Sequence, residues 1–237
     1  MYYLKTKIPD GESYSQTPYP LLGEILKSCP EVEAGTHIQS WYYPWIKAGE
    51  KEFQEITEFA DTGYFKVFAF PFKYGNAETA FLDKSSVVLS EETAEKFFGK
   101  TNPVGKTLAA DDSLQLTVTG VLYHVPTNSS VRPTILLSTA LLESSAGFLN
   151  GANWYNTFAN NYVRLRKNSD LKKFNAKIDA IVKNNYDKDQ KKNIVFAEPF
   201  KNITQENSAL PGVIIKGAAG AGVFILLIIL VNLINLN

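Results

Sequence analysis

The chain has 237 residues, of which 45% are hydrophobic and 20% are charged, a composition typical of a folded protein with a core. Lysine plus arginine and aspartate plus glutamate number 24 each, so the formal net charge is zero and argues against a nucleic-acid partner. The single cysteine, Cys29, excludes a disulfide within the chain, and its place in an apolar helical stretch predicts a buried thiol.

The first seventy residues have the pattern of a strand, a helix and further strands. Residues 1–8 favour a short strand, and residues 17–30 favour a helix with Pro18 near its start and Pro30 at its end. Aromatic and β-branched residues dominate residues 31–70, which predicts strands along that stretch.

The same order of elements returns near the C-terminal end. Residues 162–167 alternate apolar and charged side chains, as a half-buried strand does. Residues 169–185 predict a helix with Ser169 or Asp170 as its N-cap, and residues 193–200 predict a strand. Two β-α-β units this far apart predict an α+β fold, a sandwich with a split sheet similar to the ferredoxin-like motif.

The block between these units has a different pattern of predicted elements. SSVVLS reads as a strand, and Ser90 can cap a helix that carries Glu91 and Glu92 in its first turn and stops at Gly99. LQLTVTGVLYHVP predicts another strand, whereas residues 127–156 predict loops with one short helix. We therefore expect a mixed α/β subdomain inserted between the two units.

The chain ends GAAGAGVFILLIILVNLINLN, without a charged side chain from Gly217 to Asn237. A segment that is apolar all round favours a membrane helix, here either just long enough to span or cut short. Gly217, Ala218, Ala221 and Gly222 are small residues at a spacing that lets membrane helices pack closely. The alternative is a helix buried in the soluble domain.

The residues that usually carry chemistry do not form a recognisable site. GKTNPVGKT has one residue too many for a phosphate-binding loop and follows a helix where that loop follows a strand. His37 and His124 have no second ligand at metal spacing, and no serine stands out as a nucleophile. We expect no enzyme activity, cofactor or metal in this chain.

One cluster is a candidate surface for a protein partner. WYYPW places Trp41, Tyr43 and Trp45 on one face of a strand, and such side chains supply rigid contact area. Packing between sheet and helix is the favoured alternative, since aromatic residues are common in strands.

Several segments together resemble a known family. FKVFAFPFKYGN, SVVLSEETAEKFFGKTNPVGKTL, LTVTGVLYHVPTNSS and a terminal VNLINL occur in the order and spacing of the periplasmic core domain of MacB-like ABC transporter permeases, which belong to the FtsX-like family. PYPLLGEILKSCPEVEAGT is also similar to the family's first helix and second strand. The resemblance covers nearly the whole chain.

The resemblance implies a division of the chain into parts. A porter-like subdomain would be formed by residues 1–70 and 157–201, with residues 71–156 as the inserted subdomain. Residues 202–216 would form a stalk with Pro211 and Gly212 as hinge points, followed by the start of a membrane helix at 217–237. The chain would then be an excerpt from a longer protein.

The resemblance also implies a function. In that family, ATP-driven motion of membrane helices is relayed to the periplasmic domain, which exports or extracts a substrate at the outer face of the bacterial inner membrane. The implied partners are a cytoplasmic ATP-binding subunit or domain that hydrolyses ATP, a second permease copy and membrane lipid. Docking of a periplasmic adaptor is left open, as are the cargo and the direction of transport.

Two hypotheses that assign the chain to other functional classes remain. A ligand-sensing extracytoplasmic domain of a membrane signalling protein would need a pocket with convergent polar groups. A membrane-anchored hydrolase would need a nucleophile arrangement that the sequence does not show.

Overall fold

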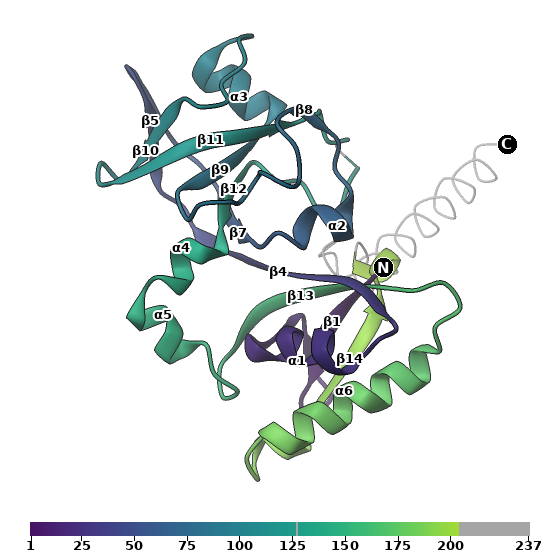
Figure 1. Ribbon diagram of the computed structural model, residues 1–237. Coiled ribbons are helices and arrows are strands. Elements are labelled where there is room, and N and C mark those ends of the chain that lie inside the picture. Colours follow the sequence, from purple (N-terminus) through teal and green to yellow (C-terminus); the bar gives the residue numbers. More distant parts are fainter. Residues whose placement is uncertain (127, 204–237) are drawn as a thin grey trace, which may run out of the picture. The chain divides into compact units, whose positions relative to one another are not determined.

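The structure, a computed structural model, describes residues 1–126 and 128–203, without the side chain of Trp41. The chain divides into two units, Met1–Phe200 and Lys201–Asn237, and almost all described residues belong to the first. Figure 1 shows the elements of the first unit. No helix in the described part of the chain is long and apolar enough to cross a membrane.

The described residues form strands, helices and two short 3₁₀ turns. The strands are β1 (Tyr2–Lys7), β2 (Ser13–Tyr14), β3 (Gln16–Pro18), β4 (Val32–Tyr42), β5 (Trp45–Ala48), β6 (Lys51–Gln54), β7 (Thr57–Ala60), β8 (Phe72–Tyr74), β9 (Ser86–Ser90), β10 (Thr107–Ala110), β11 (Leu114–Leu122), β12 (Ile135–Ser138), β13 (Thr157–Leu165) and β14 (Ile194–Pro199). The helices are α1 (Pro20–Ser28), α2 (Tyr64–Phe68), α3 (Glu91–Phe98), α4 (Thr139–Glu143), α5 (Ala146–Gly151) and α6 (Leu171–Asn185). The 3₁₀ turns are η1 (Gln190–Lys192) and η2 (Phe200–Asn202).

Hydrogen bonds join the strands into one mixed sheet. Its order is β14-β1-β13-β4-β7-β12-β9-β11-β10-β5-β6, with β2, β3 and β8 paired at its flanks. The β7–β12 and β9–β11 pairs are parallel, and the other pairs are antiparallel.

One end of the sheet contains both β-α-β units, which we call the first lobe: β1–β3, α1, β13, α6, β14 and the start of β4. The strand order β14-β1-β13-β4 interleaves the units as in the ferredoxin-like motif, so the expected α+β split sheet is confirmed. Helices α1 and α6 contact each other, α1 contacts β4 and α6 contacts β14 (Figure 1). Their apolar faces form the core of this lobe, which includes Leu4, Leu21, Ile25, Cys29, Val163, Phe174, Ile178 and Val182.

The other end of the sheet forms the second lobe, made of β5–β12, α3 and the end of β4. Ser90 caps α3, since its side chain accepts a hydrogen bond from the backbone N–H of Thr93, and Gly99 ends the helix with a φ of 67°. Phe97 of α3 packs into a core of strand residues. That core includes Ile46, Phe59, Val87, Leu89, Leu108, Leu116, Val118, Val121, Ile135 and Leu137.

Strand β4 belongs to both lobes. Its first residues pair with β13, as in Val163 opposite Gly35, and its last residues pair with β7, as in Thr57 opposite Tyr42. The register shifts between Gln39 and Tyr42. The strand therefore carries the chain from one core to the other.

Three predictions about local structure are wrong. Pro18 lies in β3, and Pro20 occupies the first turn of α1 instead. Residues 64–68 form α2, not a strand, because Asp61 and Gly63 make a turn that starts the helix: the Asp61 side chain accepts the N–H of Gly63 at 2.7 Å. Residues 127–156, for which the sequence predicts loops with one short helix, contain the buried strand β12 and two helices.

The predicted boundaries at residues 70 and 156 stay predictions. The proposed hinge residues Pro211 and Gly212 lie outside the described residues, as do the small residues of the C-terminal run, Gly217, Ala218, Ala221 and Gly222.

Candidate partner surface

The aromatic cluster WYYPW lies where β4 ends and β5 begins. Tyr43 and Trp45 are 53% and 52% exposed, whereas Pro44 between them is buried. Tyr42 is half-buried and packs against the second core, its ring stacked on Phe59 with 5.8 Å between centroids. The favoured interpretation, packing between sheet and helix, therefore does not hold for Tyr43 and Trp45.

A side chain that is distant in sequence holds one side of the cluster in place. Asp111 follows β10, and its Oδ1 accepts the backbone N–H of Trp45 at 2.9 Å while its Oδ2 accepts the hydroxyl of Tyr42 at 3.0 Å. The backbone N–H of Asp111 donates in turn to the carbonyl of Trp45 at 2.9 Å. Asp111 and Asp112 both have positive φ, 45° and 57°, in a tight turn that aims the carboxylate back at β5.

The neighbouring connection between β6 and β7 holds the other side. Thr57 donates through its hydroxyl to the carbonyl of Tyr42 at 2.7 Å, and the side-chain amide of Gln54 donates to the carbonyl of Tyr43 at 3.1 Å. Ile56 lies in this connection and is 58% exposed. The backbone of the cluster is thus fixed from both sides, with Tyr43, Trp45 and Ile56 exposed to solvent.

The pKa of Tyr42 favours its hydrogen bond to Asp111. Burial, and after it the hydrogen bond to Asp111 and the charge of that carboxylate, together raise the pKa of its hydroxyl to about 12. The hydroxyl therefore stays protonated and keeps donating to Asp111 at neutral pH. We call the exposed residues Tyr43, Trp45 and Ile56, with their support Asp111, the aromatic corner.

The aromatic corner has the properties of a contact surface. Rigid exposed aromatic side chains lose little conformational entropy on binding and often provide the central contacts of protein interfaces. Its chemistry supports binding and offers no nucleophile. The side chain of Trp41, the third member predicted from the sequence, lies outside the described residues.

The two histidines lie in different surroundings. His37 lies buried in β4, and His124 is exposed beside the Glu92 carboxylate. Among residues 1–126 and 128–203, no group of three histidine, cysteine or acidic side chains is placed to hold a metal ion.

A groove of about 490 Å³ is present elsewhere on the second lobe. Thr117 and Thr119 of β11 line it together with Leu82 and Val104, which are 77% and 40% exposed. The lining carries no pair of charged groups that would select a particular ligand.

Three solved structures share this fold. A domain of a putative permease protein from Porphyromonas gingivalis is 24% identical, with a TM-score of 0.72, over 84% of this chain and 89% of that chain. The extracellular domain of the noncanonical ABC-type transporter YknZ from Gram-positive bacteria is 16% identical, with a TM-score of 0.57, over 83% of this chain and all of that chain. The periplasmic region of MacB from Actinobacillus actinomycetemcomitans is 16% identical, with a TM-score of 0.61, over 88% of this chain and 94% of that chain.

The family model described as the MacB-like periplasmic core domain matches residues 2–181, a range that includes the second lobe and the first lobe up to most of α6. No curated protein matches the chain. The match in sequence and the shared fold agree with the resemblance carried by the motifs between Phe65 and Ser130. The chain belongs to the family of MacB-like periplasmic core domains.

Proposed function

We propose that this chain is the extracytoplasmic part of an ABC transporter permease subunit and that it relays ATP-driven motion of membrane helices to a substrate at the outer face of the inner membrane. The observation that carries the proposal is the family match over residues 2–181. The proposed partners are a cytoplasmic ATP-binding subunit and a second permease copy.

The location of the domain can be tested in the full-length protein. Cys29, which is buried, is replaced by Ser, and Lys188, an exposed residue between α6 and η1, is replaced by Cys. A membrane-impermeant maleimide should then label the new cysteine in cells whose outer barrier has been opened. Labelling that begins only after the inner membrane is dissolved would place the domain in the cytoplasm and overturn the proposal.

The relay is proposed to run through residues 202–216, with Pro211 and Gly212 as hinges. A proline has a fixed φ and a glycine an unusually free one, so the pair combines a rigid and a flexible position. Gly212→Pro in the full-length transporter should leave ATP hydrolysis in place and abolish export, because the motion would no longer reach the domain. Undiminished export by this variant would remove the hinge from the proposal.

The aromatic corner is proposed as the surface that contacts a protein partner outside the membrane, an adaptor being the candidate. A photo-crosslinking amino acid in place of Trp45 should capture that partner in cells that carry the whole transporter. The matched control is the same replacement at Tyr155, which is 65% exposed in the segment before β13. Equal capture at both positions would show that position 45 has no special role.

A second pair of variants separates binding from folding. Tyr43→Ser removes an exposed ring, so we expect a change in unfolding free energy within about 0.5 kcal/mol, the usual range for a surface substitution. Asp111→Asn keeps the size of the side chain and weakens its hold on Tyr42 and Trp45. Both variants should weaken capture of the partner, and only the second should lower the melting temperature.

A further inference from the structure

The two lobes are joined by two passages of the chain. Strand β4 leads from the first lobe into the second, and the segment made of α4 and α5 leads back to β13. Leu141 and Leu142 of α4 pack against the second core. Phe148 of α5 contacts rings of the first lobe instead, with 5.1 Å to Tyr19 and 5.8 Å to Phe158 between centroids. The α4–α5 segment therefore rests on both lobes.

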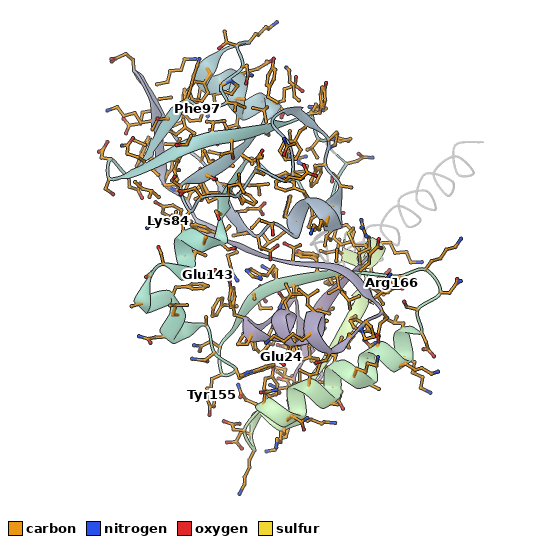
Figure 2. The ribbon with its side chains drawn as sticks, viewed as in Figure 1. Glu24, Lys84, Phe97, Glu143, Tyr155 and Arg166 are labelled. Atoms are coloured by element: carbon orange, nitrogen blue, oxygen red, sulfur yellow. The ribbon has the colours of Figure 1, made fainter. Side chains whose placement is uncertain are left out.

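Tyr19, which directly precedes α1, is the centre of that contact. Its hydroxyl donates to Oε1 of Glu143 at 2.5 Å, and Figure 2 labels Glu143 at the end of α4. Its ring lies 4.4 Å from the ring of His37 and 5.1 Å from that of Phe148. One side chain of the first lobe thus touches β4 and both helices of the returning segment.

Polar side chains are buried on β4 and β13, in contrast to the apolar cores of the two lobes, and one of them, His37, contacts Tyr19. His37 and Gln39 are 8% and 0% exposed on the same face of β4, and Asn161, opposite His37 on β13, is 1% exposed. Both ring nitrogens of His37, both amide atoms of Gln39 and Oδ1 of Asn161 are buried without a hydrogen-bond partner in the described structure. Asp61 Oδ2 lies 3.4 Å from Nδ1 of His37.

Such groups oppose the close packing of the strands that carry them. A buried polar atom without a partner loses its hydration and gains no hydrogen bond, so its burial opposes folding. Regions with fewer apolar contacts open more readily than the cores around them. His37, Gln39 and Asn161 therefore place unsatisfied polar atoms on β4, the strand shared by both lobes, and on its partner β13.

We propose that Tyr19 is a latch: its contacts with Glu143 and Phe148 hold the α4–α5 segment on the first lobe, and their release lets the two lobes move relative to each other about β4. The register shift of β4 between Gln39 and Tyr42 gives this strand a place to bend. The latch is independent of the proposed transport function, since it concerns only the lobes of this domain.

The experiment measures a distance between the lobes in the full chain. Cys29 is replaced by Ser, and spin labels are attached to cysteines at Lys84, an exposed residue of the second lobe, and Lys172, an exposed residue of α6. The parent protein should give one narrow distance distribution. Tyr19→Ala should broaden it and add a second distance, with the ratio of open to closed molecules rising about fivefold or more.

Two controls distinguish a released latch from a damaged fold. Tyr186→Phe removes another hydroxyl of the first lobe, one that is buried without a partner, and should leave the distribution unchanged. A second label pair within one lobe, at Lys84 and Lys100, should give the same distribution in the parent and in every variant. If Tyr19→Ala disturbs that internal distance, the proposal is tested with the milder variant Glu143→Ala instead. Glu143 is exposed, so removing its side chain leaves no cavity in a core.

Glu143→Ala removes only the acceptor of the Tyr19 hydroxyl and should also broaden the inter-lobe distribution. Tyr19→Phe should match it, since both delete the same hydrogen bond. An inter-lobe distribution that stays as narrow as the parent's in Glu143→Ala and Tyr19→Phe, with the internal distance intact, would overturn the proposal.

Discussion

The side chain of Asn175 takes the place of a neighbouring strand beside Ala197. Its Oδ1 accepts the backbone N–H of Ala197 at 2.9 Å, and its Nδ2 donates to the carbonyl of the same residue at 3.4 Å. Ala197 lies in β14, which ends the order of the sheet on that side. The amide of a helix side chain thus occupies backbone groups that an added strand would otherwise use.

Replacing Asn175 should expose this edge. Asn175→Ala leaves the N–H and carbonyl of Ala197 without these partners, which should lower the free energy of unfolding by about 1–3 kcal/mol. The open edge should also favour pairing between copies, detectable as a concentration-dependent dimer by size-exclusion chromatography with light scattering. The control is Asn185→Ala on the same helix, whose amide only donates to the carbonyl of Ile181. Equal behaviour of the two variants would contradict this role of Asn175.

Two glycines should respond in opposite ways to a methyl group. A Cβ on Gly63, at the start of α2, would lie 2.0 Å from the carbonyl oxygen of Gly35 in β4, a backbone atom that cannot move aside. A Cβ on Gly23, within α1, meets nothing within 4 Å. Gly63→Ala should cost several degrees of melting temperature or prevent folding. Gly23→Ala should add up to about 1 kcal/mol, because alanine is the better helix former. Similar melting temperatures for both variants would show that α2 does not approach β4 this closely.

The cap of α3 should contribute measurably to the second lobe. Ser90 accepts the N–H of Thr93 at 3.2 Å and is only 6% exposed. Ser90→Ala should lower the free energy of unfolding by about 1 kcal/mol, the usual cost of a lost N-cap, as measured by urea denaturation. Ser144→Ala, which removes an exposed serine hydroxyl, should change it by less than about 0.5 kcal/mol. A cost for Ser90→Ala no larger than for Ser144→Ala would mean that the cap adds nothing.

Glu58 should make stability depend on pH. Burial raises the pKa of its carboxyl, and the hydrogen bond from Ser40 only partly opposes this. A carboxyl with a raised folded-state pKa holds its proton more tightly when folded, so its contribution is greatest below the unfolded value of about 4.3 and is lost as pH rises through the folded value.

The stability of Glu58→Gln relative to the parent should therefore increase as the pH rises. The variant keeps an acceptor for Ser40 but has no charge to bury, so its melting temperature should exceed the parent's near neutral pH and approach the parent's near about pH 4. Melting curves of both proteins across this range measure the difference. Glu24→Gln, on α1, serves as the control, because its side chain is 41% exposed and pairs with Lys27 at the surface. A difference that stays constant across the pH range would contradict the burial of the charge.

Much of the fold follows from local patterns in the sequence. The helix α6 has its apolar residues at helical spacing behind the N-cap Asp170, and Ser90 and Gly99 mark both ends of α3. The alternation of Val163 and Leu165 with charged residues predicts β13. Where one face of an element is buried and the other solvated, the period alone identifies it.

The missed elements lack such a period. Helix α2 is five residues long and mostly apolar, a length at which helix and strand cannot be told apart by pattern. Strand β12 is buried at all four positions and has no polar face to reveal it. Its type is decided by pairing with β7 and β9, which are distant in sequence.

The candidate surface was predictable in part. The residue types of WYYPW identify a contact surface or a core element, and only tertiary structure separates the two. The exposure of Trp45 depends on Asp111, which lies 66 residues further along the chain. No signal near the cluster itself reveals that support.

The position of β1 has a consequence for synthesis of the chain. This strand lies between β13 and β14, with Tyr2 opposite both Val163 and Pro199, so these two neighbours in the sheet are made long after it. The ribosome therefore releases β1 with only the short strand β2 as an early partner. Its pairings with β13 and β14 must wait, while the second lobe, whose strand pairings all lie between residues 38 and 138, can already form. Any factor that shields nascent chains would have its greatest effect on the first few residues of this domain.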